Sequence, residues 1–288
     1  MYNRRAYIRR AIESVLAQSH SDFELIVVDD GSTDECSTLV RGCRDTRVRL
    51  VSQSNAGAGA ARNRGILEAE SDWVAFLDSD DEWLPGFLEQ CVSLATLNPE
   101  VGAVFTNIRS TVPDKPWLAL QFASPRVLDD YFALAVQNRG RGMTSSSVMV
   151  RKQALKSIGG FPVGVHRSED LDTWLRLAIT FTVGCVPEVL AVYHTETAGS
   201  VALFPEPFFP EAVRTLRRFR REGRIPKQFM ASLARLENIY LLIYARDLLV
   251  YGDRVRAATV LFRECALEHS PPQLVLRAIA RLLVPPRE

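Results

Sequence analysis

The sequence predicts an α/β protein: a mostly parallel sheet flanked by helices, followed by a helical C-terminal region. Short apolar runs alternate with segments of helical periodicity between residues 5 and 108, which is the pattern of βαβ units. Aspartate-rich turns follow two of these runs. Beyond residue 210 only helical periodicity continues. We therefore expect one domain over residues 1–200 and a helical appendage over residues 201–288.

Composition narrows the class of protein. The chain has 288 residues, a formal net charge of +1, 47% hydrophobic and 24% charged residues, as in a globular protein. The near-zero charge argues against nucleic-acid binding by bulk electrostatics. Five scattered cysteines without a CxxC pair argue against a disulfide framework or structural zinc. This use of cysteine predicts a reducing, cytoplasmic setting.

The first elements follow from periodicity. Apolar residues from Ile8 to Leu16 recur at helical spacing and predict a helix over residues 5–18. The run from Phe23 to Val28 is apolar apart from Glu24, as in a buried strand. The alternation then predicts strands over 48–51, 73–77 and 101–108, and helices over 34–43, 56–69 and 87–97.

The rest of the chain is less regular. Prolines and glycines interrupt the pattern from 112 to 145. Further on, the pattern predicts a strand over 146–150, helices over 153–158 and 168–179, and an extended segment over 183–194. A proline-rich hinge over 205–210 precedes the appendage, which has 15 basic and 9 acidic residues from position 200 onward and an apolar helical pattern over 274–284.

Two aspartate clusters follow predicted strands. Asp29 and Asp30 end the first strand, and Asp78 and Asp80 lie in the turn after the third. Ligands of open parallel sheets bind at the carboxyl ends of strands. Two carboxylates one residue apart can share Mg²⁺ or Mn²⁺, which prefer oxygen ligands. One cluster alone would suit ordinary turn and N-cap residues, but two at successive strand ends favour a binding site.

Several motifs lie at characteristic spacing along residues 2–200. Together they resemble family 2 glycosyltransferases of the GT-A fold, and their order makes the resemblance more specific than any one of them. No such match extends beyond residue 200. The motifs are Val27-Val28-Asp29-Asp30-Gly31-Ser32, Asn55-Ala56-Gly57 with Ala61-Arg62-Asn63, Phe76-Leu77-Asp78-Ser79-Asp80-Asp81, Ser147-Val148-Met149-Val150-Arg151 before Gly159-Gly160-Phe161, Glu169-Asp170 six residues before Arg176, and Tyr193-His194.

The resemblance implies a nucleotide site. Tyr2 would lie near the base, Asp30 would bind the base edge, and Asp29 would support the turn. Arg62 would approach the nucleotide or brace Asp78, and Ser79 would also belong to the nucleotide-binding residues. The implied donor is a nucleotide-diphospho-sugar, most commonly a UDP-sugar in this family, with GDP- and dTDP-sugars left open.

The resemblance also implies a metal and a base. Asp78 and Asp80 would form the DxD motif, with Asp80 as the direct ligand of Mn²⁺ or Mg²⁺. His194 would reach the diphosphate or the metal. Asp170, in the pair with Glu169, would be the general base that deprotonates an acceptor hydroxyl, giving sugar transfer with inversion. The implied acceptor is a glycan or lipid-linked molecule of cell-surface polysaccharide or glycoconjugate synthesis.

Other interpretations stay open at this point. Glu169 and Asp170 could simply complement a helix dipole, and a lone histidine such as His194 is more often structural. The arginine-rich appendage could contact the inner membrane face or pack its apolar stripe against the protein. A sugar nucleotidyltransferase or a non-catalytic nucleotide-binding scaffold remains an alternative. A phospho-receiver module is disfavoured, because the sequence has no lysine at a suitable position after a later strand. A Rossmann dehydrogenase is disfavoured, because no GxGxxG motif follows a predicted strand.

One departure from the family concerns the N-terminus. Family members carry an apolar strand just before the residue that matches Tyr2, and this sequence lacks it. Such a strand would lie centrally in the sheet, so we expect unpaired backbone groups and a groove where it is missing. We favour a start assigned too late over a truncated chain or rearranged edges.

Overall fold

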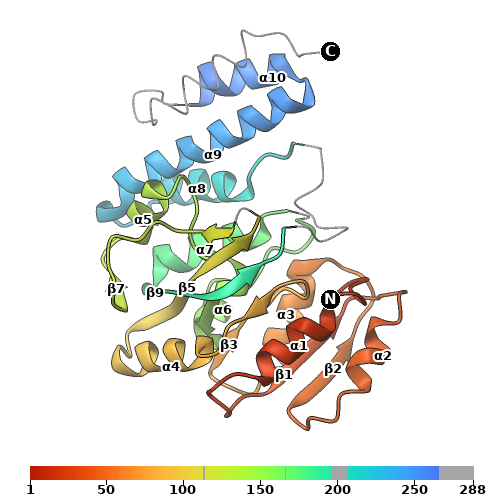
Figure 1. Ribbon diagram of the computed structural model, residues 1–288. Coiled ribbons are helices and arrows are strands. Elements are labelled where there is room, and N and C mark those ends of the chain that lie inside the picture. Colours follow the sequence, from red (N-terminus) through yellow and green to blue (C-terminus); the bar gives the residue numbers. More distant parts are fainter. Residues whose placement is uncertain (113, 166, 196–206, 266–288) are drawn as a thin grey trace. The chain divides into compact units, whose positions relative to one another are not determined.

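The structure is a computed structural model that describes residues 1–112, 114–165, 167–195 and 207–265 (Figure 1). The chain forms two compact units. The first unit contains residues 1–129 and 143–198, and the helical unit contains residues 130–142 and 199–288. Residues 130–142 therefore group with the helical C-terminal part, although they lie inside the region that the sequence assigned to the domain of residues 1–200.

The first unit opens with a small α/β layer. Two strands pair in parallel, with Leu25 opposite Val48, as a separate two-stranded sheet. Ile8 and Ile12 pack against Val27 of this sheet and are buried there. The predicted first helix and strand are thus confirmed, with shorter bounds. The elements are α1 (Ile8–Leu16), β1 (Leu25–Asp29), α2 (Cys36–Arg41), β2 (Val48–Ser52) and α3 (Ala58–Glu68).

Met1, which directly precedes the residue that follows the family's missing strand, lies beside the end of β1. Its amino group donates to the carbonyl of Val28 at 2.5 Å, and its carbonyl accepts from the amide of Asp30 at 2.9 Å. Burial lowers the pKa of this amino group, while the charges of Asp29 and Asp30 act in the opposite direction. In the described residues β1 and β2 belong to a sheet of their own, separate from the larger one.

The larger sheet is mixed. Its strand order is β3-β8-β5-β9-β4, with β6 beside β5 and β7 beside β9. β5 and β9 run parallel, whereas β8 lies antiparallel between β3 and β5. The expected α/β sheet is thus present with mixed pairing, because β8, which follows the irregular segment of residues 112–145, lies between β3 and β5. The strands are β3 (Trp73–Ala75), β4 (Glu82–Trp83), β5 (Val101–Thr111), β6 (Asp114–Pro116), β7 (Arg126–Leu128), β8 (Val148–Arg151) and β9 (Thr182–Tyr193).

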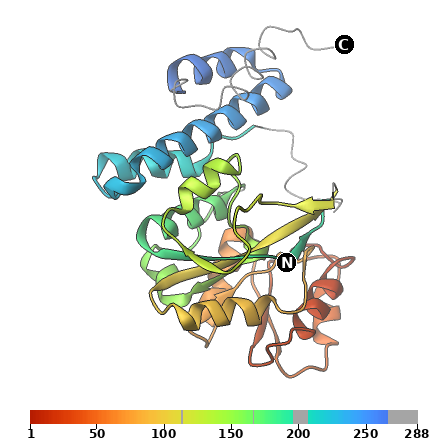
Figure 2. The same ribbon diagram turned by 60° about the vertical axis from the view of Figure 1, so that its left-hand side comes forward.

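Helices cover both faces of this sheet (Figure 1, Figure 2). Val104 and Met149 point to one face and join a core with α4 (Phe87–Leu97). The alternate residue Phe105 is fully buried outside that core, as the two-residue period of a strand requires. The ribbon views place α7 (Glu169–Thr180) on this second face, where Trp174 is buried. The remaining elements here are η1 (Ser145–Ser147) and α6 (Lys152–Ser157).

The helical unit packs around its long helix α9 (Met230–Tyr251). Glu237 of this helix accepts from Arg217 at 2.7 Å and from Arg220 at 2.8 Å, so part of the arginine run is neutralised inside the unit. In the described residues no helix is long and apolar enough to cross a membrane. The apolar pattern over 274–284 lies outside the described residues. The helices are α5 (Tyr131–Gln137), α8 (Glu211–Arg221), η3 (Lys227–Phe229), α9 (Met230–Tyr251), α10 (Arg254–Thr259) and the π-helical turn η4 (Val260–Glu264).

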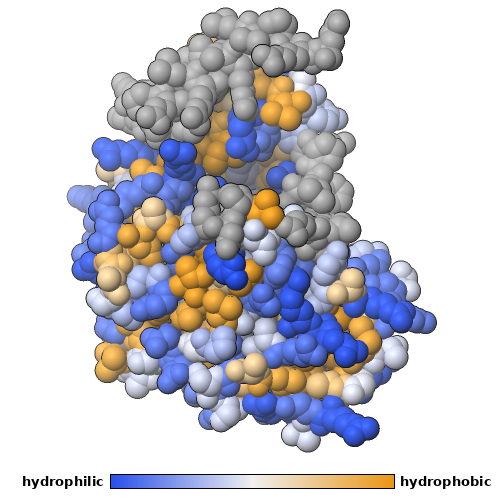
Figure 3. Space-filling model, in the orientation of Figure 1, coloured by the Kyte–Doolittle hydropathy of each residue, from blue (hydrophilic) through white to orange (hydrophobic). Residues whose placement is uncertain are grey.

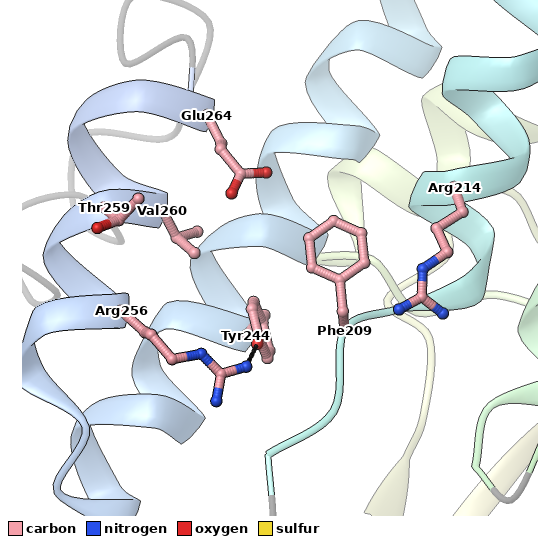
Figure 4. A pocket seen from close by; sticks show the side chains of 7 residues that line it. All are labelled: Phe209, Arg214, Tyr244, Arg256, Thr259, Val260 and Glu264. Atoms are coloured by element: carbon pink, nitrogen blue, oxygen red, sulfur yellow. Dashed lines mark hydrogen bonds between the residues drawn. The ribbon is translucent and has the colours of Figure 1, made fainter.

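A cavity of about 450 Å³ lies within the helical unit, beside α9, α10 and η4 (Figure 4). Phe209 and Tyr244 form its aromatic wall, and Arg256 donates to the hydroxyl of Tyr244 at 2.7 Å. None of the predicted catalytic, nucleotide-binding or metal-binding residues lines it. The candidate chemistry of the chain is therefore built elsewhere, in the first unit.

Candidate active site

The turn after β1 is organised by two buried aspartates. Asp29 Oδ1 accepts from the amide of Ser32 at 3.0 Å. The carboxylate of Asp30 accepts from the amides of Ala56 and Gly57 at 2.9 and 2.8 Å, and from the side-chain amide of Gln53 at 2.7 Å. Asp30 thus fixes the loop before α3. A carboxylate has about four acceptor positions, so Asp30 retains capacity for one more donor.

The N-terminal segment runs along this turn. The amide of Asn3 donates to Ser32 Oγ at 3.0 Å, and the side-chain oxygen of Asn3 accepts from the amide of Thr33 at 2.8 Å. Tyr2, between these anchors and Met1, is 46% exposed. A solvent-facing aromatic ring beside a buried acidic turn has the character that stacking on a nucleotide base requires.

The DxD motif forms a tight turn after β3. The amide of Asp81 donates to the carbonyl of Asp78 at 3.0 Å, which places Ser79 and Asp80 at the tip. Asp78 is paired with Arg62 at 2.7 Å. Asp80 faces Arg4, whose Nε lies 3.7 Å from Oδ2. Burial raises the pKa of Asp80, and the negative charge of Asp78 raises it further.

Arg62 of α3 joins the DxD turn to the first turn of α7. One guanidinium nitrogen contacts Asp78 and another contacts Glu169, which is 107 residues away in the sequence. The side chains of Arg62 and Glu169 are only 14% and 10% exposed. Burial lowers the pKa of Arg62, but Asp78 and Glu169 outweigh it and the net pKa lies above the ordinary value. The arginine therefore stays charged and bridges both acidic clusters.

The neighbouring Asn63 holds α3 against the loop before α7. Its side-chain amide exchanges two hydrogen bonds with the backbone of Phe161, both at 2.8 Å. Gly160 has φ +66°, and a Cβ there would lie 2.5 Å from the Asn63 oxygen. A Cβ on Gly59 would lie 2.6 Å from the Pro162 carbonyl. Glycine is required at both points for the close approach that sets the distance between Arg62 and α7.

Asp170 lies in the first turn of α7, next to Glu169. Burial raises its pKa, the negative charge of Glu169 adds to the rise, and Arg62 lowers it, which leaves the pKa at about 6. A carboxyl group with this pKa is mostly ionised at neutral pH and is a better proton acceptor than an ordinary aspartate. Asp78, Arg62, Glu169 and Asp170 thus form one coupled cluster.

Asp81 connects the DxD turn to β9. This aspartate is 1% exposed. It accepts from Ser146 Oγ at 2.5 Å and from the amide of His194 at 3.0 Å. Ser146 Oγ in turn accepts from the amide of Asp78 at 3.1 Å. The backbone of His194 is therefore held beside the turn, while its imidazole lies 3.2 Å from Glu82.

The carboxylate pair at the turn fits a divalent cation by its chemistry. Asp78 and Asp80 offer hard oxygen donors one residue apart, and a cation would relieve the repulsion that raises the pKa of Asp80. In the described ranges no three His, Cys, Asp or Glu side chains converge on a metal position. The pair suits a cation that takes its other ligands from phosphates and water. The Nε2 atom of His194 lies 3.2 Å from Oε1 of Glu82.

Sequence reasoning gave no role to four residues of this site. Asp81 was visible in the acidic cluster, but its link to Ser146 spans 65 residues and depends on where β8 lies. Arg4 and Arg10 both reach Asp80 from the N-terminal segment, with Arg10 donating to its carbonyl. No spacing pattern in the sequence links Arg4 or Arg10 to Asp80.

Comparison with known proteins places these features in a family. Residues 1–159 match Glycosyl transferase family 2. TuaG of Bacillus subtilis (strain 168), whose name assigns it provisionally to teichuronic acid biosynthesis as a glycosyltransferase, is 34% identical over 67% of this chain and 75% of its own length. An uncharacterized glycosyltransferase of Nostoc sp. is 32% identical over 56% of this chain. The chain spans about half (51%) of that relative's length.

Solved structures show the same fold. S. aureus TarS 1–349 in complex with UDP-GlcNAc matches with a TM-score of 0.66 at 18% identity, over 98% of this chain and 78% of TarS 1–349. The mannosyltransferase PcManGT of Pyrobaculum calidifontis, in complex with GDP-Man and Mn²⁺, matches with a TM-score of 0.64 at 20% identity, over 98% of this chain and 83% of PcManGT. With its α/β architecture and the ordered motifs, the chain belongs to glycosyltransferase family 2 and has the GT-A fold.

Proposed function

We propose that this chain transfers a hexose from a nucleotide-diphospho-sugar to an acceptor hydroxyl, with inversion at the anomeric carbon. The observation that carries the proposal is the cluster in which Arg62 bridges Asp78 of the DxD turn and Glu169 beside Asp170. Through Arg62, this cluster connects the Asp78-Asp80 pair, which suits a divalent cation, to Asp170, which suits the role of general base. The acceptor is a glycan or lipid-linked molecule of cell-surface polysaccharide or glycoconjugate synthesis, made on the cytoplasmic side of the membrane.

In this reaction each residue has a distinct task. Asp170 takes the proton of the acceptor hydroxyl while the oxygen attacks the anomeric carbon and the nucleoside diphosphate leaves from the opposite face. Asp78 and Asp80 would hold Mn²⁺ or Mg²⁺, which when bound neutralises negative charge on the leaving diphosphate. Asp30 and Tyr2 lie at the turn that we assign to the base. His194 remains a candidate for the diphosphate or the metal.

The first test is nucleotide binding by calorimetry. We expect one of UDP, GDP and dTDP to bind with Mn²⁺ and to bind at least about tenfold more weakly without it, because charge-assisted contacts to a diphosphate contribute roughly 1.5–3 kcal/mol each. UDP and GDP are favoured because the complexes of TarS and PcManGT contain UDP-GlcNAc and GDP-Man.

Asp80→Ala should lose the Mn²⁺-dependent part of this binding, while Asp22→Ala, at an exposed position, should keep it. A folded chain that binds none of the three nucleotides would count against the transferase. Metal-dependent binding without turnover of any sugar nucleotide would favour the non-catalytic alternative.

We also propose that α8 makes a peripheral contact with an anionic membrane. Arg217 and Arg220 are paired with Glu237, but Arg218 and Arg221 are exposed three residues apart on the same helix. Each exposed arginine near an anionic surface contributes about 1 kcal/mol. Co-sedimentation with vesicles containing phosphatidylglycerol should therefore decrease in Arg218→Glu/Arg221→Glu. Equal sedimentation of this variant and the wild type would contradict the contact.

A further inference from the structure

Two arginines of the N-terminal segment converge on Asp80. The Nε of Arg4 lies 3.7 Å from Oδ2 of Asp80, and the two side chains are 16% and 18% exposed. Arg10, on α1, donates from Nη2 to the backbone carbonyl of Asp80. The charges of both arginines oppose the rise in the pKa of Asp80 that burial and Asp78 cause. The two aspartates of the DxD motif thus have different cationic partners: Arg62 contacts Asp78, whereas Arg4 and Arg10 contact Asp80.

The contact between Arg4 and Asp80 is a loose one. It joins one guanidinium nitrogen to one carboxylate oxygen at 3.7 Å, whereas strong arginine–carboxylate pairs are bidentate and shorter. Arg62, by comparison, contacts Asp78 at 2.7 Å. Arg10 Nε is buried and has no hydrogen-bond partner among the described residues. At the tip of the turn, Arg4 thus touches Asp80 only through this long contact, and Arg10 retains one buried donor.

We propose that Arg4 is an exchangeable counter-ion of Asp80, which moves from this carboxylate to a diphosphate oxygen of the donor when a divalent cation binds Asp80. The proposal rests on the proposed function, since it takes the ligand to be a nucleoside diphosphate. Arg10 keeps hold of the Asp80 carbonyl and fixes the tip of the turn during the exchange.

Electrostatics makes the exchange depend on the diphosphate. A cation that binds Asp80 alone displaces Arg4 and leaves a guanidinium beside a divalent charge, and like charges at this range repel strongly in a partly buried site. A diphosphate supplies negative charge that compensates both the cation and the arginine beside it. The metal and the nucleotide should therefore bind more tightly together than separately, and each should raise the affinity for the other by the same factor.

The variant Arg4→Met distinguishes the exchange from a purely structural role of Arg4. The exchange predicts that this variant binds Mn²⁺ more tightly and the nucleotide more weakly. Binding of Mn²⁺ alone, measured from the electron paramagnetic resonance of the free ion, should tighten about threefold or more because Asp80 loses its competing cation. Binding of UDP or GDP at saturating Mn²⁺ should weaken by about tenfold, the effect of one charge-assisted hydrogen bond. Arg9→Met, an exposed arginine on α1, is the matched control and should change neither.

The outcomes distinguish this inference from the proposed function. Wild-type protein that binds neither nucleotide argues against the proposed function, and the Mn²⁺ measurement still decides the relation of Arg4 to Asp80. If the wild type binds nucleotide and Arg4→Met changes both affinities in the same direction, or neither, the exchange is overturned. Arg4→Lys, which keeps the charge, should show smaller shifts of the same signs and serves if the methionine variant does not fold.

Discussion

Asp170→Asn is expected to lower the rate of sugar transfer by about 10²- to 10⁴-fold, the usual contribution of a general base. An amide of the same shape cannot accept the proton of the acceptor hydroxyl. Donor binding should change by less than about twofold, because the proposed donor contacts are made by Asp30, Asp78 and Asp80, whereas Asp170 Oδ1 accepts from the amide of Leu171. Initial rates and nucleotide titrations on the same preparations measure the two effects.

Asp172→Asn is the matched control, two residues further along α7. Asp172 is 2% exposed and accepts from Arg176 Nε at 2.8 Å. Arg176 also donates to the carbonyls of Ile158 and Gly160, so this pair supports the loop that carries Gly160. Its loss should lower the thermal midpoint of unfolding, whereas Asp170→Asn should not. Asp170→Asn with more than a tenth of the wild-type rate would exclude Asp170 as the base.

The pH dependence follows from the pKa of Asp170. With a pKa of about 6, the base is protonated below that pH and the rate should fall as the pH decreases through it. The stability effect has the opposite sign. The unfolded carboxyl titrates near 3.8, so between pH 3.8 and 6 the folded state binds more protons, and this group destabilises the fold increasingly as the pH rises. Asp170→Asn removes that penalty above pH 6.

The sequence predicted the elements well where periodicity is local. Strands such as 48–52 and helices such as 87–97 lie within a residue or two of their expected positions. Strand order was less accessible, because periodicity shows which face of a strand is buried but not its neighbour in the sheet. The antiparallel insertion of β8 beside β3 is therefore a feature that only the structure shows, and the contact of Ser146 with Asp81 depends on it.

The candidate active site, like the fold, could be predicted from the sequence only in part. The motifs identified the aspartates of the two turns and the Glu169-Asp170 pair, all of which lie at element ends. On the face shown in Figure 3 hydrophilic residues predominate, and hydrophobic residues reach the surface in the region where Figure 1 draws β1 and β2. The bridges between the clusters come from Arg62 and Arg4, and their partners are 16 to 107 residues away. Single arginines carry no spacing signal that could identify such partners.

Arg62→Met is expected to have the largest effect on stability. It leaves Asp78, Glu169 and Asp170 without the cation that joins them, and breaking one partner of a buried ion pair costs about 3–5 kcal/mol of unfolding free energy. Sugar transfer should fall below detection, since the two acidic clusters lose their connection. Arg64→Met, two residues on in α3, is the control: its side chain is 45% exposed and pairs with Glu68, so its loss should cost less than about 1 kcal/mol.

Dependence on pH separates the charge of Arg62 from its packing against Phe161, whose ring centre is 5.3 Å from the guanidinium carbon. Arg62 lowers the pKa of Asp170, so in Arg62→Met this pKa rises above about 6 and the penalty for an ionised Asp170 grows. Protonation removes that penalty, and the stability lost in the variant should therefore be smaller at pH 5 than at pH 8. Loss of packing alone would be equal at both pH values. Urea unfolding of the variant and the wild type at the two pH values distinguishes these causes, and an equal loss would show that Arg62 stabilises the fold through contact area instead of charge.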